Sequence, residues 1–338
     1  MKKWMVGGAI VLCGVAWHGM MLPVGQEEIR AAVGKSLPLL AKSSHIFLEN
    51  AGGCHSCHGQ GMGLIVFGMA KEKGFAVNLA ALQEAIDSVK NDLNGFRFTW
   101  AEATDPQALV IGGGYDIWGL SVNHYPINKQ LLLCVRDMME RQGATGNWIP
   151  PGLRPPLEYY PVSATAMAVR AMRIYAAAQW PDEVARRTQR AADWLAHSVA
   201  RTNEERVFQL LGLSWAGWRP EQMASMAKGL LARQRADGGW AQLDSLESDS
   251  YATGQSLFAL DQSGQLAVEA PAYQRGVAFL LRTQLEDGSW EVKSRTIPSV
   301  PFVSSGFPHG DNQFISAAGT NWAVMALVLA AKPGVAGR

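Results

Sequence analysis

The sequence predicts an all-α fold in which helical hairpins close into a toroid, an α/α barrel of the α6/α6 type. Three observations lead to this expectation. Apolar residues recur at the helical period of about 3.6 residues, and no segment sustains the period-two alternation of a strand. A spaced motif of Gln, Gly and Trp recurs from residue 142 onward. With 338 residues and 48% hydrophobic content, the chain can bury the core that a ring of helices needs.

The charge balance excludes two classes of partner. The chain has 30 Lys and Arg against 29 Asp and Glu, so it offers neither a basic groove for nucleic acid nor a cationic surface for acidic lipids. Disorder is excluded too, because nearly half of the residues can be buried. We therefore expect a globular protein with no nucleic-acid partner.

Residues 1–22 have the pattern of a signal peptide. Lys2 and Lys3 precede an apolar run from residue 4 to residue 16, and Gly14-Val15-Ala16 would serve as a small-residue cleavage site. Without cleavage, the stretch 4–24 is just long enough to anchor in a bilayer. Either way, the pattern predicts a periplasmic or secreted protein, and no later segment reads as a membrane span.

Twelve segments carry the helical pattern and are expected to pair into hairpins. In chain order they are 29–40, 64–73, 79–89, 115–125, 131–141, 162–178, 183–199, 205–216, 221–233, 251–261, 273–283 and 316–331. Alternate segments differ in composition. The later member of each pair is rich in Ala, Gly and Thr, as expected for a closely packed inner ring, whereas the earlier members carry the Arg and Glu of an outer ring.

The repeated motif has the form Gln-x-x-x-Gly-x-Trp. Its copies are Gln142/Gly146/Trp148, Gln234/Gly238/Trp240 and Gln284/Gly288/Trp290, and Val199 stands where an eroded copy would have its Gln. The spacing of about 47 residues fits one helical hairpin per unit. We expect the outer helix to end near the Gln, the Gly to supply the turn, and the Trp to pack back over the helix end. The Gln amide can then bind backbone groups left open there.

These residues resemble a known group. The stretch Arg275 to Trp290, Arg-Gly-Val-Ala-Phe-Leu-Leu-Arg-Thr-Gln-Leu-Glu-Asp-Gly-Ser-Trp, looks like a complete QW repeat of the squalene-hopene cyclase and prenyltransferase superfamily. The resemblance covers roughly residues 114–331 and implies the terpenoid-cyclase type of toroid. We divide the chain into a signal peptide at 1–22, an N-terminal helical segment at 23–110 and the toroid at 111–338.

The resemblance also implies a candidate acid. Class II cyclases of this group protonate an alkene with the middle Asp of a D-x-D-D-T-A motif, and the matching stretch here is Glu247-Ser-Asp249-Ser-Tyr251-Ala. Asp249 matches the central Asp, but two of the three acids are missing and Tyr251 replaces the Thr. The alternative is that Asp249 is only the N-cap of its helix. The zinc site of the prenyltransferases is not expected, since no Cys follows Cys134.

A second motif lies before the repeats, at Gly53-Cys54-His55-Ser56-Cys57-His58. Two Cys at this spacing followed by His form the attachment sequence of c-type haem, with thioether bonds from Cys54 and Cys57 and His58 as an axial ligand of the iron. Water, His45, His55 or His124 could supply the sixth ligand, and no Met occurs between residues 75 and 110. A disulfide between Cys54 and Cys57, or a metal site made by Cys54, Cys57, His55 and His58, would also explain the motif.

The leading functional expectation is a secreted protein that binds an apolar polyisoprenoid or lipid in the toroid, with Asp249 as the acid of a divergent class II cyclase and one haem c. It would then need a redox partner, and a squalene-sized cavity would have to be completed by a partner protein or by a second copy of the chain. One alternative is a non-catalytic scaffold with a Cys54–Cys57 disulfide. Another is a polysaccharide-active enzyme that uses a rim of carboxylates and aromatic residues, made by Glu158, Tyr159 and Tyr160 with Glu247 and Asp249. His309 and Asp311, before the last helix, would form an acid/base pair or only close their turn.

Overall fold

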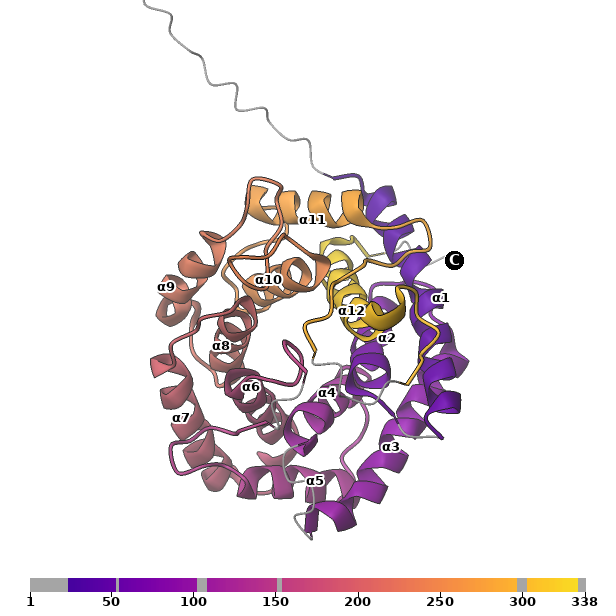
Figure 1. Ribbon diagram of the computed structural model, residues 1–338. Helices are drawn as coiled ribbons and strands as arrows, with labels where there is room; N and C mark the ends of the chain where they lie inside the picture. Colours follow the sequence, from indigo (N-terminus) through magenta and orange to yellow (C-terminus); the bar gives the residue numbers. More distant parts are fainter. Residues whose placement is uncertain (1–23, 53–54, 102–107, 151–153, 297–302, 334–338) are drawn as a thin grey trace, which may run out of the picture.

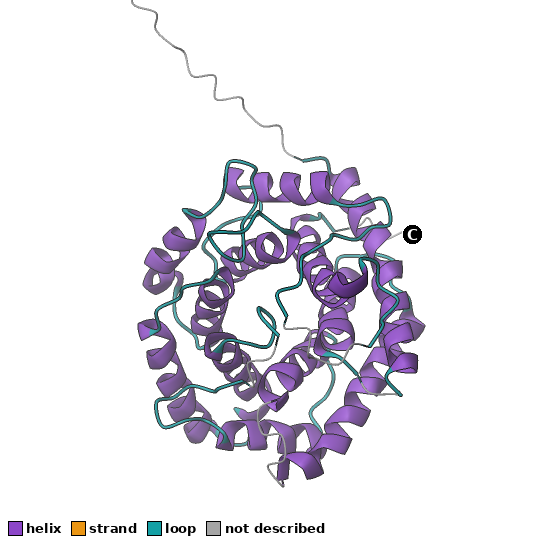
Figure 2. Ribbon diagram, viewed as in Figure 1, coloured by secondary structure: helices purple, strands orange, loops and turns teal. Residues whose placement is uncertain are grey.

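The computed structural model describes residues 24–52, 55–101, 108–150, 154–296 and 303–333, without the side chains of residues 57, 96–101 and 108–109. Within these ranges the chain is helical and forms no strand, so the predicted all-α class is confirmed. Figures 1 and 2 show two concentric rings of helices. The predicted signal peptide and Cys54 lie outside the described residues.

Outer and inner helices alternate along the described chain. The outer helices are α1 (Gln26–Asn50), α3 (Leu79–Ala101), α5 (Lys129–Glu140), α7 (Pro181–His197), α9 (Pro220–Leu231) and α11 (Pro271–Thr283). The inner helices are α2 (Met62–Glu72), α4 (Ala108–Val122), α6 (Pro161–Ala171), α8 (Asn203–Trp215), α10 (Ser250–Gln262) and α12 (Gln313–Ala330). Each inner helix contacts the next, and α12 contacts α2, which closes the ring. Short π-helical segments are η1 (Cys57–Gly61) and η2 (Met172–Ala176), and η3 (Gly310–Asn312) is a 3-10 turn.

The segment with the CxxCH motif is part of this ring. The sequence analysis placed residues 23–110 ahead of the toroid, but α1 and α3 lie in the outer ring and α2 lies in the inner ring between α12 and α4. The physical reason is the composition of α2, whose residues 62–68 are all buried. An element that is apolar on all sides needs neighbours on all sides.

Burial separates the two rings. In α12 nearly every residue from Ile315 to Val328 is buried, whereas α7 buries one stripe, represented by Val184, Ala191 and Leu195. The segment Gly310–Ala330 has the length and mean hydropathy, 1.4, of a membrane span, but 89% of it is buried inside the protein. It is therefore explained as a core helix.

We use the term corner for each connection from an outer helix to the next inner helix. Because the two kinds of helix alternate, all corners open on the same face of the ring, here called the corner face. At the corner between α9 and α10, Gln234 donates from Nε2 to the carbonyl oxygens of Gly238 (2.9 Å) and Ala272 (2.7 Å). Trp240 donates from Nε1 to the Leu230 oxygen at 2.9 Å, over the end of α9. The Gln therefore joins its own turn to the next outer helix.

The other two motif corners repeat this geometry. Trp148 and Trp290 donate to the oxygens of Met138 and Leu280, ten residues back in each case. Gln284 reaches across the chain ends to α1, where it donates to the Ala32 oxygen at 2.9 Å. Gly288 has φ +87°, and a Cβ there would lie 2.7 Å from the Lys35 carbonyl oxygen. The last motif copy thus joins the end of α11 to α1 by hydrogen bonds.

The eroded corner between α7 and α8 uses a different residue. Val199 is 76% exposed, and Gln209 of α8 donates instead to the oxygens of Leu195 (2.6 Å) and Ser198 (2.9 Å). An amide from the inner helix therefore satisfies the carbonyl groups at the end of α7, and the corner is free to carry other residues.

Aromatic side chains pack in the centre of the inner ring. Trp322 of α12 lies 5.6 Å from Phe258, 6.0 Å from Trp118 and 6.1 Å from Phe208, measured between ring centroids. These tilted and edge-to-face contacts join α4, α8, α10 and α12. Arg170 of α6 lies over the rings of Trp118 and Trp215 at 5.1 and 5.0 Å. Aromatic side chains from these inner helices thus meet in the interior of the ring.

Candidate functional site

Asp249 stands at the corner face as the N-cap of α10. Its Oδ1 accepts the backbone N–H of Ala252 at 2.7 Å, and its Oδ2 accepts from Gln242 Nε2 at 2.8 Å. Burial raises the pKa of Asp249 to about 6, although both of these hydrogen bonds favour the ionised form. Both oxygens are therefore occupied in holding the corner, as the N-cap alternative predicts.

Glu204 is a more deeply buried carboxyl group on the neighbouring inner helix. It lies in the first turn of α8 and is only 2% exposed. Burial raises the pKa of Glu204 to about 8, against the opposing effect of the hydrogen bonds from Gln255 and Tyr251. The group is therefore a neutral carboxylic acid at neutral pH.

The hydrogen bonds of Glu204 are asymmetric. Its Oε2 accepts from Gln255 Nε2 at 2.6 Å and from the Tyr251 hydroxyl at 3.0 Å, whereas its Oε1 is buried without a partner. An oxygen that already accepts two hydrogen bonds is the poorer site for the acid proton, so the proton belongs on Oε1. The O–H group then has no acceptor in the protein.

Polar atoms without partners gather around this acid. Gln255 Oε1 and Trp322 Nε1 are buried without hydrogen bonds. Burial raises the pKa of Tyr251 well above its ordinary value, and the nearby Trp322 opposes this effect only in part. Arg295 donates to Gln242 Oε1 at 3.0 Å, while its Nη2 is also buried without a partner. Since buried polar groups are normally satisfied, this cluster has the character of a binding site.

Of the predicted haem residues, only His58 can be placed in full. Cys54 lies outside the described residues, and Cys57 begins η1 with an undescribed side chain. The His58 ring is 5% exposed and makes edge contacts with Phe47 and Phe314 at 6.0 and 5.8 Å between centroids. Burial lowers the pKa of His58 to about 3, and its Nδ1 has no hydrogen-bond partner. The ring is therefore a neutral imidazole with an unused nitrogen, as an axial ligand requires.

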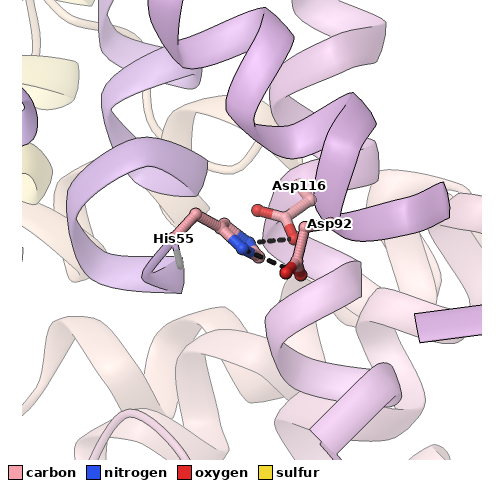
Figure 3. A group of neighbouring side chains, drawn as sticks. All are labelled: His55, Asp92 and Asp116. Atoms are coloured by element: carbon pink, nitrogen blue, oxygen red, sulfur yellow. Dashed lines mark hydrogen bonds and ion pairs between the residues drawn. The ribbon is translucent and has the colours of Figure 1, made fainter. Parts of the chain in front are cut away.

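His55 lies between two carboxylates from different helices, as Figure 3 shows. Its Nε2 is 2.6 Å from Asp116 Oδ2 of α4, and its Nδ1 is 2.8 Å from Asp92 Oδ2 of α3. Burial opposes protonation of His55, but Asp116 and Asp92 together raise its pKa well above the usual value. Burial also raises the pKa of Asp116, which is 1% exposed.

Two other histidines considered as iron ligands pair with carboxylates on the surface. His45 is bound to Glu84 at 2.8 Å and His124 to Glu72 at 3.0 Å, each on the surface. His309 shares a hydrogen bond of 2.8 Å with Ser289 Oγ and precedes the 3-10 turn η3 that contains Asp311. This pair closes the turn before α12, and neither residue faces Glu204 through a hydrogen bond that the structure records.

Sequence reasoning missed Glu204, Asp92 and Asp116. Asp116 had a detectable signal, because it is the single charged residue in the otherwise apolar segment 108–122. Glu204 also had one, since it is the second residue of an inner helix, as the buried Tyr251 is in α10 and the buried Gly63 in α2. Asp92 had no comparable signal, because α3 carries other charged residues on its outer face.

Comparison with protein-family models gives no match, and comparison with curated proteins gives none either. Solved structures do match. The type II terpene cyclase MstE from Scytonema, in its apo form, is 13% identical, with a TM-score of 0.58 over 91% of this chain and 99% of that chain. A variant of MstE in complex with geranylgeranyl dihydroxybenzoate, its substrate, is 13% identical, with a TM-score of 0.60 over 90% and 98%.

A third match is a protein from Actinoplanes, 14% identical, with a TM-score of 0.56 over 87% of this chain and 99% of that chain. Identities this low carry information about the fold alone. The coverage is nearly complete in both directions, so the likeness extends to α1–α3 as well as to the repeats. The chain therefore has the α/α toroid of the terpenoid cyclase type.

Proposed function

We propose that the protein binds an apolar isoprenoid chain inside the toroid and that Glu204 protonates it, as the acid of a divergent class II cyclase. The observation that carries this proposal is the buried Oε1 of Glu204, which has no partner on an acid with a pKa of about 8. Asp249, with its pKa raised to about 6, supports the corner beside it. MstE, with a similar fold, has been solved with an isoprenoid-bearing substrate.

The surroundings of Glu204 suit a hydrocarbon substrate. The wall formed by Trp118, Phe208, Phe258 and Trp322 is apolar, and aromatic faces stabilise positive charge through their quadrupoles. A cation generated from an alkene would therefore lie against rings rather than against water. The unpartnered atoms near the corner face, including Arg295 Nη2 and Gln255 Oε1, would contact the polar end of the molecule.

The proposed reaction is an isomerisation. The O–H bond at Glu204 Oε1 breaks as a C–H bond forms at one carbon of a double bond, and the other carbon becomes a cation. A second double bond of the same chain donates its electron pair to that cation and closes a ring. The final cation then loses a proton to the Glu204 carboxylate, or to Asp249, so the product has the mass of the substrate and no oxidant is needed.

The test uses the full chain and geranylgeraniol as the probe. We expect saturable binding by equilibrium dialysis and, on incubation, cyclised products of unchanged mass by gas chromatography with mass detection. Glu204→Gln should bind the probe with similar affinity and lose at least 99% of the conversion, in keeping with a general acid that contributes roughly 100-fold or more. Glu247→Gln is the matched control, an exposed acid at the α9–α10 corner.

Three outcomes distinguish the parts of this proposal. Binding without conversion by the wild type would remove the acid role and leave an isoprenoid-binding module. The absence of binding would overturn the proposal as a whole and favour a scaffold. Release of sugars from a polysaccharide panel, sensitive to Glu158→Gln, would support the carbohydrate alternative instead.

For the CxxCH motif we propose attachment of one haem c through Cys54 and Cys57, with His58 as axial ligand. The support is chemical: a neutral, buried imidazole whose Nδ1 is unpaired, together with the spacing of the motif. The bound haem would supply electron transfer. The residues of this chain would hold it, and the Asn321 amide, which donates to the His58 carbonyl oxygen at 3.1 Å, would fix the segment that carries the ligand.

The test is a pyridine haemochrome spectrum of the full chain, expressed in a host that attaches haem in the periplasm. We expect the sharp α band of c-type haem, lost in the double variant Cys54→Ala/Cys57→Ala. No band, together with loss of two thiols on oxidation, would establish the disulfide alternative. Since haem is attached outside the cytoplasm, the c-type band would also support the proposed signal peptide.

A further inference from the structure

The corner between α1 and α2 contains a set of ligand atoms that the haem motif does not use. His55 precedes η1, Asp92 lies in α3 and Asp116 lies in α4, and one ligand atom from each lies within 4.8 Å of the others. The side chains are 7%, 15% and 1% exposed, respectively. Three elements thus direct an imidazole and two carboxylates at one buried point.

Hydrogen bonds do not satisfy this cluster. Asp116 Oδ1 is buried with no hydrogen-bond partner, and so is His55 Nδ1, whose 2.8 Å approach to Asp92 does not have hydrogen-bond geometry. Gly61 leaves room for this carboxylate, since a Cβ at that position would lie only 2.7 Å from Asp116 Oδ1. A nearly fully buried carboxylate with an unused oxygen is rare in the absence of a ligand.

The charges are also unbalanced. Two carboxylates beside a protonated imidazole leave one net negative charge in a buried place, and the ion pairs of the described residues bring no Lys or Arg to Asp92 or Asp116. A divalent cation beside a neutral imidazole would bring the sum to zero. Burial of an uncompensated charge is costly, so a cation explains an arrangement that the protein atoms alone do not.

We propose that His55, Asp92 and Asp116 bind a divalent transition-metal ion of the zinc class. One nitrogen and carboxylate oxygens suit Zn²⁺, Mn²⁺ or Fe²⁺, whereas Mg²⁺ and Ca²⁺ prefer oxygen ligands alone. Bonds of about 2.0–2.2 Å place tetrahedral ligands about 3.4 Å apart. One nitrogen of His55 would bind the ion, and the ligand atoms of the three residues, which lie within 4.8 Å of one another, would shift to that spacing. The ion would join the CxxCH segment to α3 and α4.

This site differs from the metal alternative considered for the sequence, which used the cysteines and His58. It needs no thiolate, and the test can therefore be carried out without them. The full chain is prepared as Cys54→Ser/Cys57→Ser, which removes both haem attachment and thiolate ligands, and is stripped with a chelator. Zn²⁺ alone is then titrated by calorimetry, and Co²⁺ is added separately as a spectroscopic probe.

We expect one Zn²⁺ per chain, weak d–d absorption bands with Co²⁺, and a rise in Tm on Zn²⁺ binding. Asp92→Asn/Asp116→Asn in the same background should weaken Zn²⁺ binding at least 100-fold. Glu84→Gln is the matched control, because it alters the exposed pair with His45 and should leave binding unchanged. His55→Gln provides a second variant should the double variant not fold.

Three results would count against the proposal. One is the absence of both Zn²⁺ binding and Co²⁺ bands in the cysteine-free protein, which would leave His55 as an imidazolium between two carboxylates. Another is metal binding that survives His55→Gln and the double Asp variant, which would place the ion elsewhere. Metal bands that appear only when Cys54 and Cys57 are present would also count against it.

Discussion

The corners of the toroid are of two kinds. Those between α5 and α6, α9 and α10, and α11 and α12 carry the Gln-Gly-Trp motif, whose Gln amide donates to the Gly carbonyl oxygen of its own turn; Asp249 at the α9–α10 corner caps its helix. Those between α1 and α2 and between α7 and α8 lack the motif and hold buried ionisable groups, the His55 cluster with His58 in one and Glu204 in the other. Where the repeated amide and indole are absent, the ring has room for chemistry.

The two kinds of corner therefore have different roles in the same fold. A motif corner fixes the angle between hairpins, because its Gln binds the next outer helix and its Trp covers the previous one. A corner without the motif is held by other contacts, such as Gln209 in α8. Such a corner can then keep a titratable side chain in a place of low dielectric, where its pKa changes most.

The largest expected effect concerns a motif Trp. Trp240→Ala removes a fully buried indole and its hydrogen bond to Leu230, so we expect a loss of about 3–5 kcal/mol in the free energy of unfolding. Urea denaturation measures it, with Trp180→Ala, a partly exposed indole on the outer ring, as the control. A loss below about 1 kcal/mol would mean that the motif does not hold the corner.

The second prediction concerns pH and the buried acid at the α7–α8 corner. Because the folded pKa of Glu204, about 8, lies above its ordinary value of 4.5, the folded state holds this proton more tightly. Its contribution is fully present below pH 4.5 and is lost as pH rises toward 8, with a slope of up to about 1.4 kcal/mol per pH unit.

Urea denaturation across pH 6–8 tests this slope, because the contribution of Asp249, with a folded pKa of about 6, falls mainly below that range. We expect the wild type to become less stable with rising pH and Glu204→Gln to lack most of that dependence. The neighbouring Glu205→Gln, which alters the capping box of α8, should keep it. Equal slopes in wild type and Glu204→Gln would show that Glu204 is ionised in the folded state.

A smaller effect is expected at the ring closure. Gln284→Ala removes hydrogen bonds to Ala32, Ser36 and Gly288 and should cost about 1–3 kcal/mol, because carbonyl groups of α1 lose their partner. Gln189→Ala, on the exposed face of α7, should change stability by less than about 0.5 kcal/mol. Thermal unfolding compares them, and an equal effect in both variants would contradict the closing role of Gln284.

The smallest effect should come from restoring the motif. Val199→Gln places the missing amide at the α7–α8 corner, but Gln209 already binds the Leu195 and Ser198 carbonyls. We therefore expect a change within about 0.5 kcal/mol. A stabilisation well above this would mean that the eroded corner remains unsatisfied.

The fold could be predicted because its signals are local and repeated. The helical period, the Gln-Gly-Trp spacing and the contrast between inner and outer helices each act within one hairpin, and together they imply a ring. The place of residues 26–101 in that ring was harder to see, since their corner carries CxxCH instead of the motif. Its long apolar α2 was the available evidence.

The site was less predictable because it depends on residues brought together from separate hairpins. Asp249 was found from its position before an inner helix, and its capping role was among the readings considered. Glu204 acquires its acid character only through burial against Tyr251 and Gln255, about fifty residues away in the chain. No spacing in the sequence encodes that contact.

The central claim is that the toroid keeps a neutral carboxylic acid, Glu204, beside aromatic walls at neutral pH. Infrared difference spectroscopy of the full chain between pH 6 and pH 9 tests it most directly. The account predicts a protonated-carboxyl stretch that disappears near pH 8, is absent in Glu204→Gln and persists in Asp249→Asn. A spectrum with no protonated carboxyl at pH 7, or a band removed by Asp249→Asn and not by Glu204→Gln, would contradict it.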